Sequence, residues 1–172
     1  MSGPEITLSE AVISQDERHR YSLTRRWGDG PRVCCWIMLN PSTADATTDD
    51  PTIRRCIGFT HGWGYDALTV VNLYAWRATD PADLRNAARA GADVVGGLND
   101  EHILAHTTHA RTVIAAWGTH PATMPDRRDE HVLNLLRRRP IHCLGTTKTG
   151  APRHPLYLRA DTPRHLYNGR TP

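Results

Sequence analysis

Four short apolar runs in this sequence each end at an asparagine, a Trp-Gly pair or a glycine, and this arrangement limits the fold more than any other feature. Short apolar runs bounded by such residues are typical of buried strands. The runs, each with the residue that follows it, are 34–39 before Asn40, 68–71 before Asn72, 112–116 before Trp117, and 141–144 before Gly145. The sequence therefore predicts strands at about 33–39, 67–73, 111–117 and 141–144.

Helical patterns separate these runs. Two of them begin at an aspartate followed by proline, Asp50-Pro51 and Asp80-Pro81, which is the usual arrangement of an N-cap and a first helical residue. A third pattern covers residues 99–108, and an amphipathic pattern covers residues 127–139. Strands that alternate with helices predict an α/β fold, here a three-layer α/β/α sandwich with a central four-stranded parallel sheet.

The chain of 172 residues fits a single domain, residues 1–172. Residues 5–30 are expected to form an N-terminal hairpin or edge strands, residues 31–150 the α/β core, and residues 151–172 a basic tail that packs on the core. No apolar run reaches the roughly 18 residues of a membrane span, and the first residues do not form a signal peptide. We expect a cytoplasmic protein with no membrane partner, monomeric by default, whose four cysteines are buried free thiols.

The residues that follow the strands predict a binding site. Ligands of parallel sheets bind outside the carboxyl ends of the strands. Asn40, Asn72, Trp117-Gly118 and His154 would therefore meet in one cleft. His154 stands in a turn with a proline on either side of the Arg153-His154 pair, which restricts the backbone and suits the pair to stabilise an anion.

Each of these residues also has a structural explanation. Asn-Pro and strand-ending asparagines are common in turns, and a histidine is more often a surface residue than a catalytic one. Phe59 is expected to pack in the core, with a stacking platform as the alternative. The helically spaced His102, His106 and His109 lack a carboxylate or cysteine that would complete a metal site, so we expect no metal and no cofactor. If the strand-end residues shared no cleft, the protein would be structural or would bind a protein partner.

The charge of the chain is compatible with a nucleic-acid partner without requiring one. The formal net charge is +3, with 10 histidines in addition. Basic residues near the predicted cleft are explained by a phosphate-facing surface or by a solvated tail. These residues are Lys148, Arg153, Arg159, Arg164 and Arg170.

Longer motifs add a resemblance. The chain strongly resembles the domain-of-unknown-function 1643 family in residues 38–44, 50–55, 71–74 and 77–81, at Trp117-Gly118, and in residues 148–155. It resembles the uracil-DNA glycosylase superfamily more distantly. Those enzymes have an Asp-Pro or Asn-Pro turn after the first central strand, an Asn after the second, a Trp-Gly after the third, and a His-Pro loop after the fourth. Here the matching residues are Asn40-Pro41, Asn72, Trp117-Gly118 and His154-Pro155.

The second resemblance implies a uracil-DNA-glycosylase-like fold and a hydrolase that excises a damaged or modified base from nucleic acid, with DNA favoured over RNA. Asn40 would orient the attacking water, since an amide is no base, and His154 would stabilise the departing base. Asn72 would read the edge of a flipped base. Phe59 or Tyr74 would stack on that base, and phosphates would be held by Ser42, Thr43, Lys148 and Arg153. The alternative is a non-catalytic module of the same fold that binds nucleic acid or a nucleotide.

Overall fold

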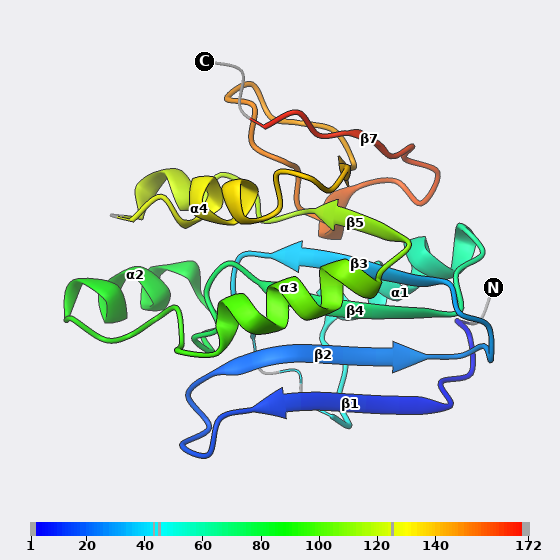
Figure 1. The fold of residues 1–172 in the computed structure, drawn as a ribbon, viewed down its shortest axis with the longest axis horizontal. Helices are drawn as coiled ribbons and strands as arrows, with labels where there is room; N and C mark the ends of the chain where they lie inside the picture. The colour runs from blue at the N-terminus through cyan, green and yellow to red at the C-terminus, as the bar shows by residue number, and fades with distance from the viewer. Residues whose placement is uncertain (1–2, 43, 45, 125, 170–172) are drawn as a thin grey trace.

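The protein folds around one mixed β-sheet with helices on both of its faces (Figure 1). The structure, a computed structural model, describes residues 3–42, 44, 46–124 and 126–169. The strands are β1 (Leu8–Ile13), β2 (Arg20–Arg26), β3 (Val33–Met38), β4 (Ala67–Asn72), β5 (Thr112–Ala115), β6 (Ile141–Cys143) and β7 (His165–Leu166). The helices are α1 (Pro51–Gly62), α2 (Pro81–Arg89), α3 (Asn99–His109) and α4 (Arg128–Leu135), with the 3₁₀ turns η1 (His120–Thr123) and η2 (Pro155–Tyr157).

The α/β class is confirmed, but the sheet is larger than the four strands expected. Its order is β1-β2-β4-β3-β5-β6-β7. The pairs β4–β3, β3–β5 and β5–β6 are parallel. The N-terminal hairpin joins the same sheet, because β2 pairs antiparallel with β4, and the tail adds β7 antiparallel to β6. In the β3–β4 pair Met38 lies opposite Asn72, so both strands end at the same level.

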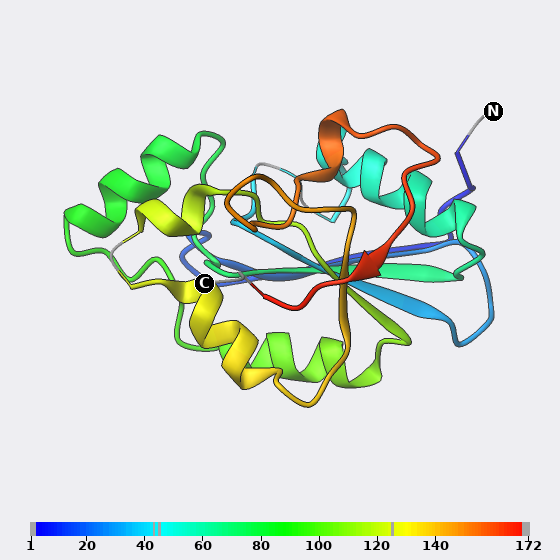
Figure 2. The same ribbon diagram turned by 90° about the horizontal axis from the view of Figure 1, so that it is seen from above.

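The alternation of side chains along the central strands gives the sheet two apolar faces. Trp36 of β3 packs with Phe59 in a core beneath α1. Its neighbour Ile37 points to the other face, into a core with Ile103 of α3 and Val132 of α4. Figure 2 shows the sheet nearly edge-on, with α1 on one side and α3 and α4 on the other. Chain segments on both faces therefore reach the carboxyl ends of the parallel strands.

The helix boundaries follow local chemistry. The Asp50 carboxylate accepts a hydrogen bond from the backbone N–H of Ile53 at 2.8 Å, and Asp80 caps α2 in the same way. The last helix is shorter than the predicted 127–139, because α4 ends at Leu135 and residues 136–139 form turns. Pro140 explains part of this difference, since it disfavours a helical conformation in the residue before it.

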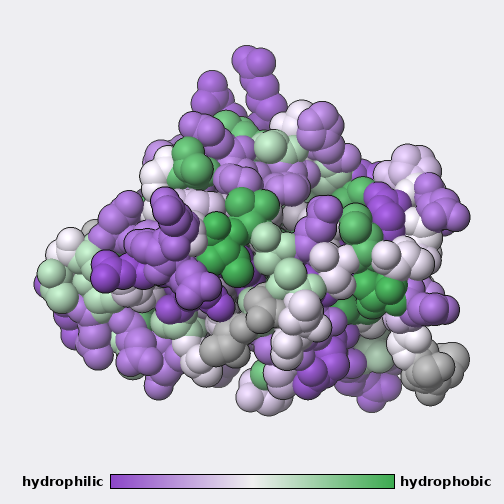
Figure 3. Space-filling view, turned by 90° about the horizontal axis from the view of Figure 1, so that it is seen from below, coloured by the Kyte–Doolittle hydropathy of each residue, from purple (hydrophilic) through white to green (hydrophobic). Residues whose placement is uncertain are grey.

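The burial of the side chains tests the expectation about the cysteines and shows which apolar residues lie at the surface. All four cysteines are buried and free. Within the described residues, no helix is both long and apolar enough to cross a bilayer. Figure 3 looks at the molecule from the side of β1 and shows separate hydrophobic areas between hydrophilic ones. Leu8 and Val12 of this edge strand are 40% and 43% exposed.

Candidate functional site

A cavity of about 650 Å³ opens at the carboxyl ends of β3 and β4, on the face covered by α1. This volume lies within the range of small-molecule sites, about 300–1,000 Å³. Strand-end residues, the start of α1 and the loops after β5 and β6 all contribute to its walls. Of the residues predicted from the sequence, the structure brings seven to the cavity. They are Asn40, Ser42, Asn72, Trp117, Gly118, Arg153 and His154.

Asn72 provides the most unusual group in this cavity. It is the last residue of β4, and by strand alternation its side chain lies on the same face as Val70, which also lines the cavity. Asn72 is only 1% exposed. Neither its Nδ2 nor its Oδ1 has a hydrogen-bond partner among the described residues. A buried polar group without a partner costs about 1–3 kcal/mol, so this amide lowers the stability of the fold unless a ligand or a water pairs with it.

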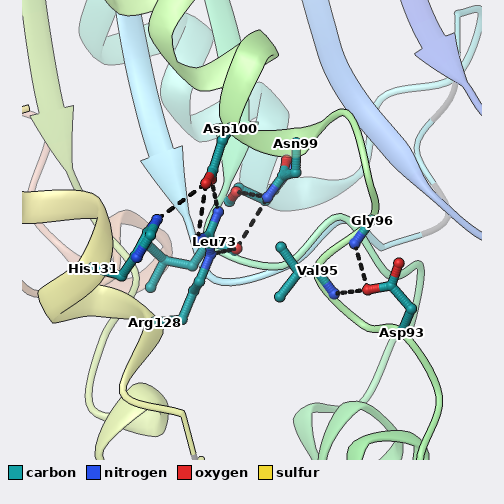
Figure 4. A network of polar contacts seen from close by, with 9 residues as sticks. Leu73, Asp93, Val95, Gly96, Asn99, Asp100, Arg128 and His131 are labelled. Atoms are coloured by element: carbon teal, nitrogen blue, oxygen red, sulfur yellow. Dashed lines mark hydrogen bonds and ion pairs between the residues drawn. The ribbon is translucent and has the colours of Figure 1, made fainter. Parts of the chain in front are cut away.

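A polar network on the opposite face fixes the end of β4 (Figure 4). The Nδ2 of Asn99 donates to the backbone carbonyls of Asn72 and Leu73, each at 3.0 Å. The Nε of Arg128 donates to the same Leu73 carbonyl at 2.9 Å. Asp100 in turn accepts from the Arg128 guanidinium and lies 3.0 Å from the Nε2 of His131. Residues at the starts of α3 and α4 thus fix the backbone that carries the Asn72 side chain, from the face of the sheet opposite α1.

Asn40 is largely committed to structure. Its Nδ2 donates to the backbone carbonyls of Ala78 at 2.8 Å, Pro41 at 3.1 Å and Trp76 at 3.4 Å. These bonds hold the loop between β4 and α2 against the end of β3. Asn40 is half-buried and lines the cavity, so its Oδ1 is the atom left to contact a ligand or a water.

His154 is a neutral hydrogen-bond donor in this setting. Its Nδ1 accepts a hydrogen bond from the backbone N–H of Leu156 at 3.3 Å, which assigns the proton to Nε2. Burial lowers the pKa of His154, although the Asp50 carboxylate acts in the opposite direction. The ring is therefore uncharged at neutral pH. An uncharged ring can donate from Nε2 without requiring a counter-charge in the cavity.

Three side chains at the cavity differ from their sequence interpretation. Asp50, predicted only as a helix cap, lines the cavity. Ser42, predicted to contact phosphate, donates its hydroxyl hydrogen to Oδ2 of Asp50. Arg20, which had no predicted role, also lines the cavity, is buried, and donates to the carbonyl of Ala44. The Asp50-Pro51 pattern is that of an ordinary helix cap. The one indication that Asp50 would lie near the cavity was its position at the start of the helix that follows β3.

The structure does not bring the two predicted stacking residues to the cavity. Phe59 packs against both Trp36 and Trp63 in the core beneath α1, because it lies on the inner face of the helix. Tyr74 points into the opposite core, where its hydroxyl donates to Asp126 at 2.6 Å. The aromatic side chain at the cavity rim is instead Tyr157, which is 90% exposed. It follows the His-Pro-Leu segment, a position that sequence reasoning left unassigned.

The predicted phosphate-binding residues are dispersed. Arg153 is exposed at the cavity, and its backbone N–H donates to the carbonyl of Gly145. Lys148 is exposed in the preceding turn and does not line the cavity. Thr43 lies outside the described residues. Of the predicted cations Lys148 and Arg153, the structure thus places Arg153 at the cavity.

Comparisons with known proteins give a family without an activity. A family model described as "Protein of unknown function (DUF1643)" matches residues 20–156, which is most of the chain and includes the cavity walls from Arg20 to Leu156. A search of curated proteins finds no match.

Proposed function

The chain belongs to the DUF1643 family of proteins of unknown function, so its activity has to be argued from the cavity, and we propose that it is a glycosylase-like hydrolase that excises a damaged or modified base from nucleic acid. The observation that carries this proposal is the buried Asn72 amide, unpartnered within the described residues, in a cavity that also contains a neutral His154. DNA is the favoured substrate.

A carboxamide is suited to recognise a nucleobase edge. It offers one donor and one acceptor side by side, which complements the adjacent N–H and C=O groups of a base such as uracil. Pairing with a base would relieve both unsatisfied atoms of Asn72 at once. Such an edge is occupied within a duplex, so the target base must leave the stack to enter the cavity.

The same cavity supports cleavage of the bond between base and sugar. When this bond breaks, its electron pair leaves with the base and negative charge develops on a base oxygen. The Nε2–H of His154 can donate to that oxygen, and a preorganised donor in a water-poor site is an effective means of stabilising such charge. Asn40 can hold the attacking water through its Oδ1. These roles are the ones that a uracil-DNA-glycosylase-like arrangement would give the loops after β3, β4 and β6.

Two rim residues suit a polymeric substrate. The exposed ring of Tyr157 can stack on a base next to the extruded one, as aromatic side chains do in single-strand binding sites. Arg153, exposed beside it, can contact a phosphate and fix the register of the strand.

One observation favours the second candidate, a module that binds a nucleobase without cleaving its bond. The Nδ2 of Asn40 is engaged with three backbone carbonyls, so this residue orients a water with one atom only. A binding module needs Asn72 and the cavity walls but makes no use of a held water.

Base release from oligonucleotides separates the two candidates. The substrates are single- and double-stranded DNA and RNA that contain uracil, hypoxanthine, hydroxymethyluracil or another modified base. Release by the wild type that falls at least 100-fold in His154→Ala, without loss of folding, supports the hydrolase. Saturable binding that Asn72→Ala abolishes, with no release, supports the binding module. Neither release nor binding would reject both.

A further inference from the structure

The cavity contains a carboxylate that the proposed reaction has not used. Of the described residues that line it, Asp50 alone carries an acidic side chain. It lies at the N-terminus of α1, where the helix dipole stabilises negative charge, and the Arg20 guanidinium belongs to the same cavity. A helix cap does not need to line a cavity, so the role of Asp50 as a cap does not explain its place in the cavity wall.

Both oxygens of Asp50 are held in place. Oδ1 accepts from the backbone N–H of Ile53 at 2.8 Å, and Oδ2 accepts from the Ser42 hydroxyl. A carboxylate has about four acceptor positions, so these two bonds orient it without exhausting it. The result is a fixed, negatively charged acceptor that lines the same cavity as the neutral His154 and the unpartnered Asn72 amide.

We propose that Asp50 is the catalytic base that accepts a proton from the attacking water; this inference rests on the hydrolase function proposed above. The bond between the sugar C1′ and the base nitrogen breaks, and its electron pair leaves with the base, whose oxygen accepts a hydrogen bond from His154. The water oxygen forms the new bond to C1′, and its proton passes to the Asp50 carboxylate. The carboxylate then returns this proton to the departing base or to solvent.

The division of labour with Asn40 follows from chemistry. An amide cannot accept the proton of a water, whereas carboxylates do so in hydrolases that cleave glycosidic bonds. The negative charge of Asp50 would also stabilise the positive charge that develops on the sugar in the transition state. Ser42, whose hydroxyl donates to Asp50, is assigned the role of a positioning residue.

The substitution Asp50→Asn tests this assignment while preserving the helix cap, because asparagine caps helices about as well as aspartate. Asp80→Asn is the matched control: it makes the same change at the cap of α2, also before a proline, and Asp80 does not line the cavity. The measurement is the single-turnover rate of base release, together with the affinity for an uncleaved oligonucleotide.

We expect Asp50→Asn to release base at least 100-fold more slowly than the wild type, within the usual range of general-base catalysis, and to bind within threefold of the wild type. Asp80→Asn should match the wild type. Ser42→Ala should slow release by less than Asp50→Asn and should bind the uncleaved oligonucleotide as the wild type does.

Several outcomes overturn the inference, and they can be told apart. If the wild type releases base and Asp50→Asn does so at a similar rate, only the role of Asp50 fails. An equal loss in the rate of base release in Asp50→Asn and Asp80→Asn would show that the rate depends on helix caps in general and not on the Asp50 carboxylate. Unfolding of both Asp50→Asn and Asp50→Ser, which also keeps a capping oxygen, would make the carboxylate structural. No release by the wild type on any base would reject the hydrolase function, and the inference with it.

Discussion

Asn72 and Asn99 are both buried near the end of β4, yet they use their amides in opposite ways. Asn99 donates two hydrogen bonds to the backbone, whereas the side chain of Asn72 donates and accepts none among the described residues. A side chain kept for a ligand is expected to contribute little to the folded state or to oppose it. The two residues therefore form a natural pair for comparing function with stability.

We expect Asn72→Ala to change the free energy of unfolding by less than about 1 kcal/mol, because the loss of packing is offset by removal of an unpartnered amide. Asn99→Ala should destabilise the protein by about 1–3 kcal/mol, because it leaves the carbonyls of Asn72 and Leu73 without their donor. Urea unfolding of both variants is the measurement. A larger destabilisation in Asn72→Ala than in Asn99→Ala would contradict a ligand-binding role for Asn72.

Single residues also show where sequence reasoning succeeds and where it stops. Asn40, Asn72 and His154 could be placed together because each lies at or beyond the carboxyl end of a predicted strand, and the ends of parallel strands share one edge. Asp50 could not be identified, because its Asp-Pro pattern is fully explained by a helix cap. Phe59 packs in the core as expected, and the alternative of a stacking role for Phe59 or Tyr74 gains no support from their positions, because a sequence identifies an aromatic ring but not the face toward which it points.

Among the elements, the turn after β5 links both sides of the cavity. The Gly118 N–H donates to the carbonyl of Pro152 at 2.9 Å, which ties the end of this strand to the loop that carries Arg153 and His154. Gly118 has a φ of +72°, a conformation that side chains other than glycine rarely adopt. Apart from Gly118 and its two chain neighbours, no described residue has an atom within 4 Å of the position that a Cβ would take.

Gly118→Ala should therefore destabilise the protein by about 1–2 kcal/mol through backbone strain alone. Gly58→Ala is the control, since Gly58 lies on the exposed side of α1, also with open space around its Cβ position. This control should stabilise the protein by about 0.4–1 kcal/mol, because alanine favours the helix and restricts the unfolded chain. Chemical denaturation gives both values, and equal effects in the two variants would show that the Gly118 turn relaxes.

At the scale of elements, the sequence predicted the helix starts better than the extent of the sheet. Asp50-Pro51 and Asp80-Pro81 mark helix starts through local hydrogen bonds, which sequence alone specifies. Pairing of β2 with β4 and of β7 with β6 depends on contacts between distant segments. Local patterns carry no information on those partners, so the seven-stranded mixed sheet could not be derived from them.

For the molecule as a whole, five histidines whose pKa is lowered in the folded state predict how stability depends on pH. Burial is the main cause that lowers the pKa of five histidines below the ordinary value of 6.5. They are His102, His106, His120, His142 and His154. Below about pH 6.5 the unfolded chain thus binds more protons than the folded one at these positions.

We expect the free energy of unfolding to fall as the pH decreases from 6.5 toward the folded-state pKa values, and to be independent of these groups above that range. Asp100 affects stability at lower pH. Burial raises the pKa of this carboxyl, but Arg128 and His131 lower it more, so the pKa lies below 3.8. The contribution of Asp100 to the free energy of unfolding is therefore lost only in stronger acid. Urea titrations between pH 5 and 7.5 test this, with His106→Asn expected to flatten the slope. A stability that rose on acidification would contradict it.

The order of the cavity walls along the chain has a consequence for biosynthesis. Asn40, Asp50 and Asn72 belong to the first half of the sequence, whereas Arg153, His154 and Tyr157 come after β6. The ribosome therefore synthesises the residues of one cavity wall long before those of the other. A nascent chain that already contains β1 to β4 still lacks the loop that carries His154 and its Nε2–H donor. Premature termination before residue 153 would yield a polypeptide with most of the strands and an incomplete cavity.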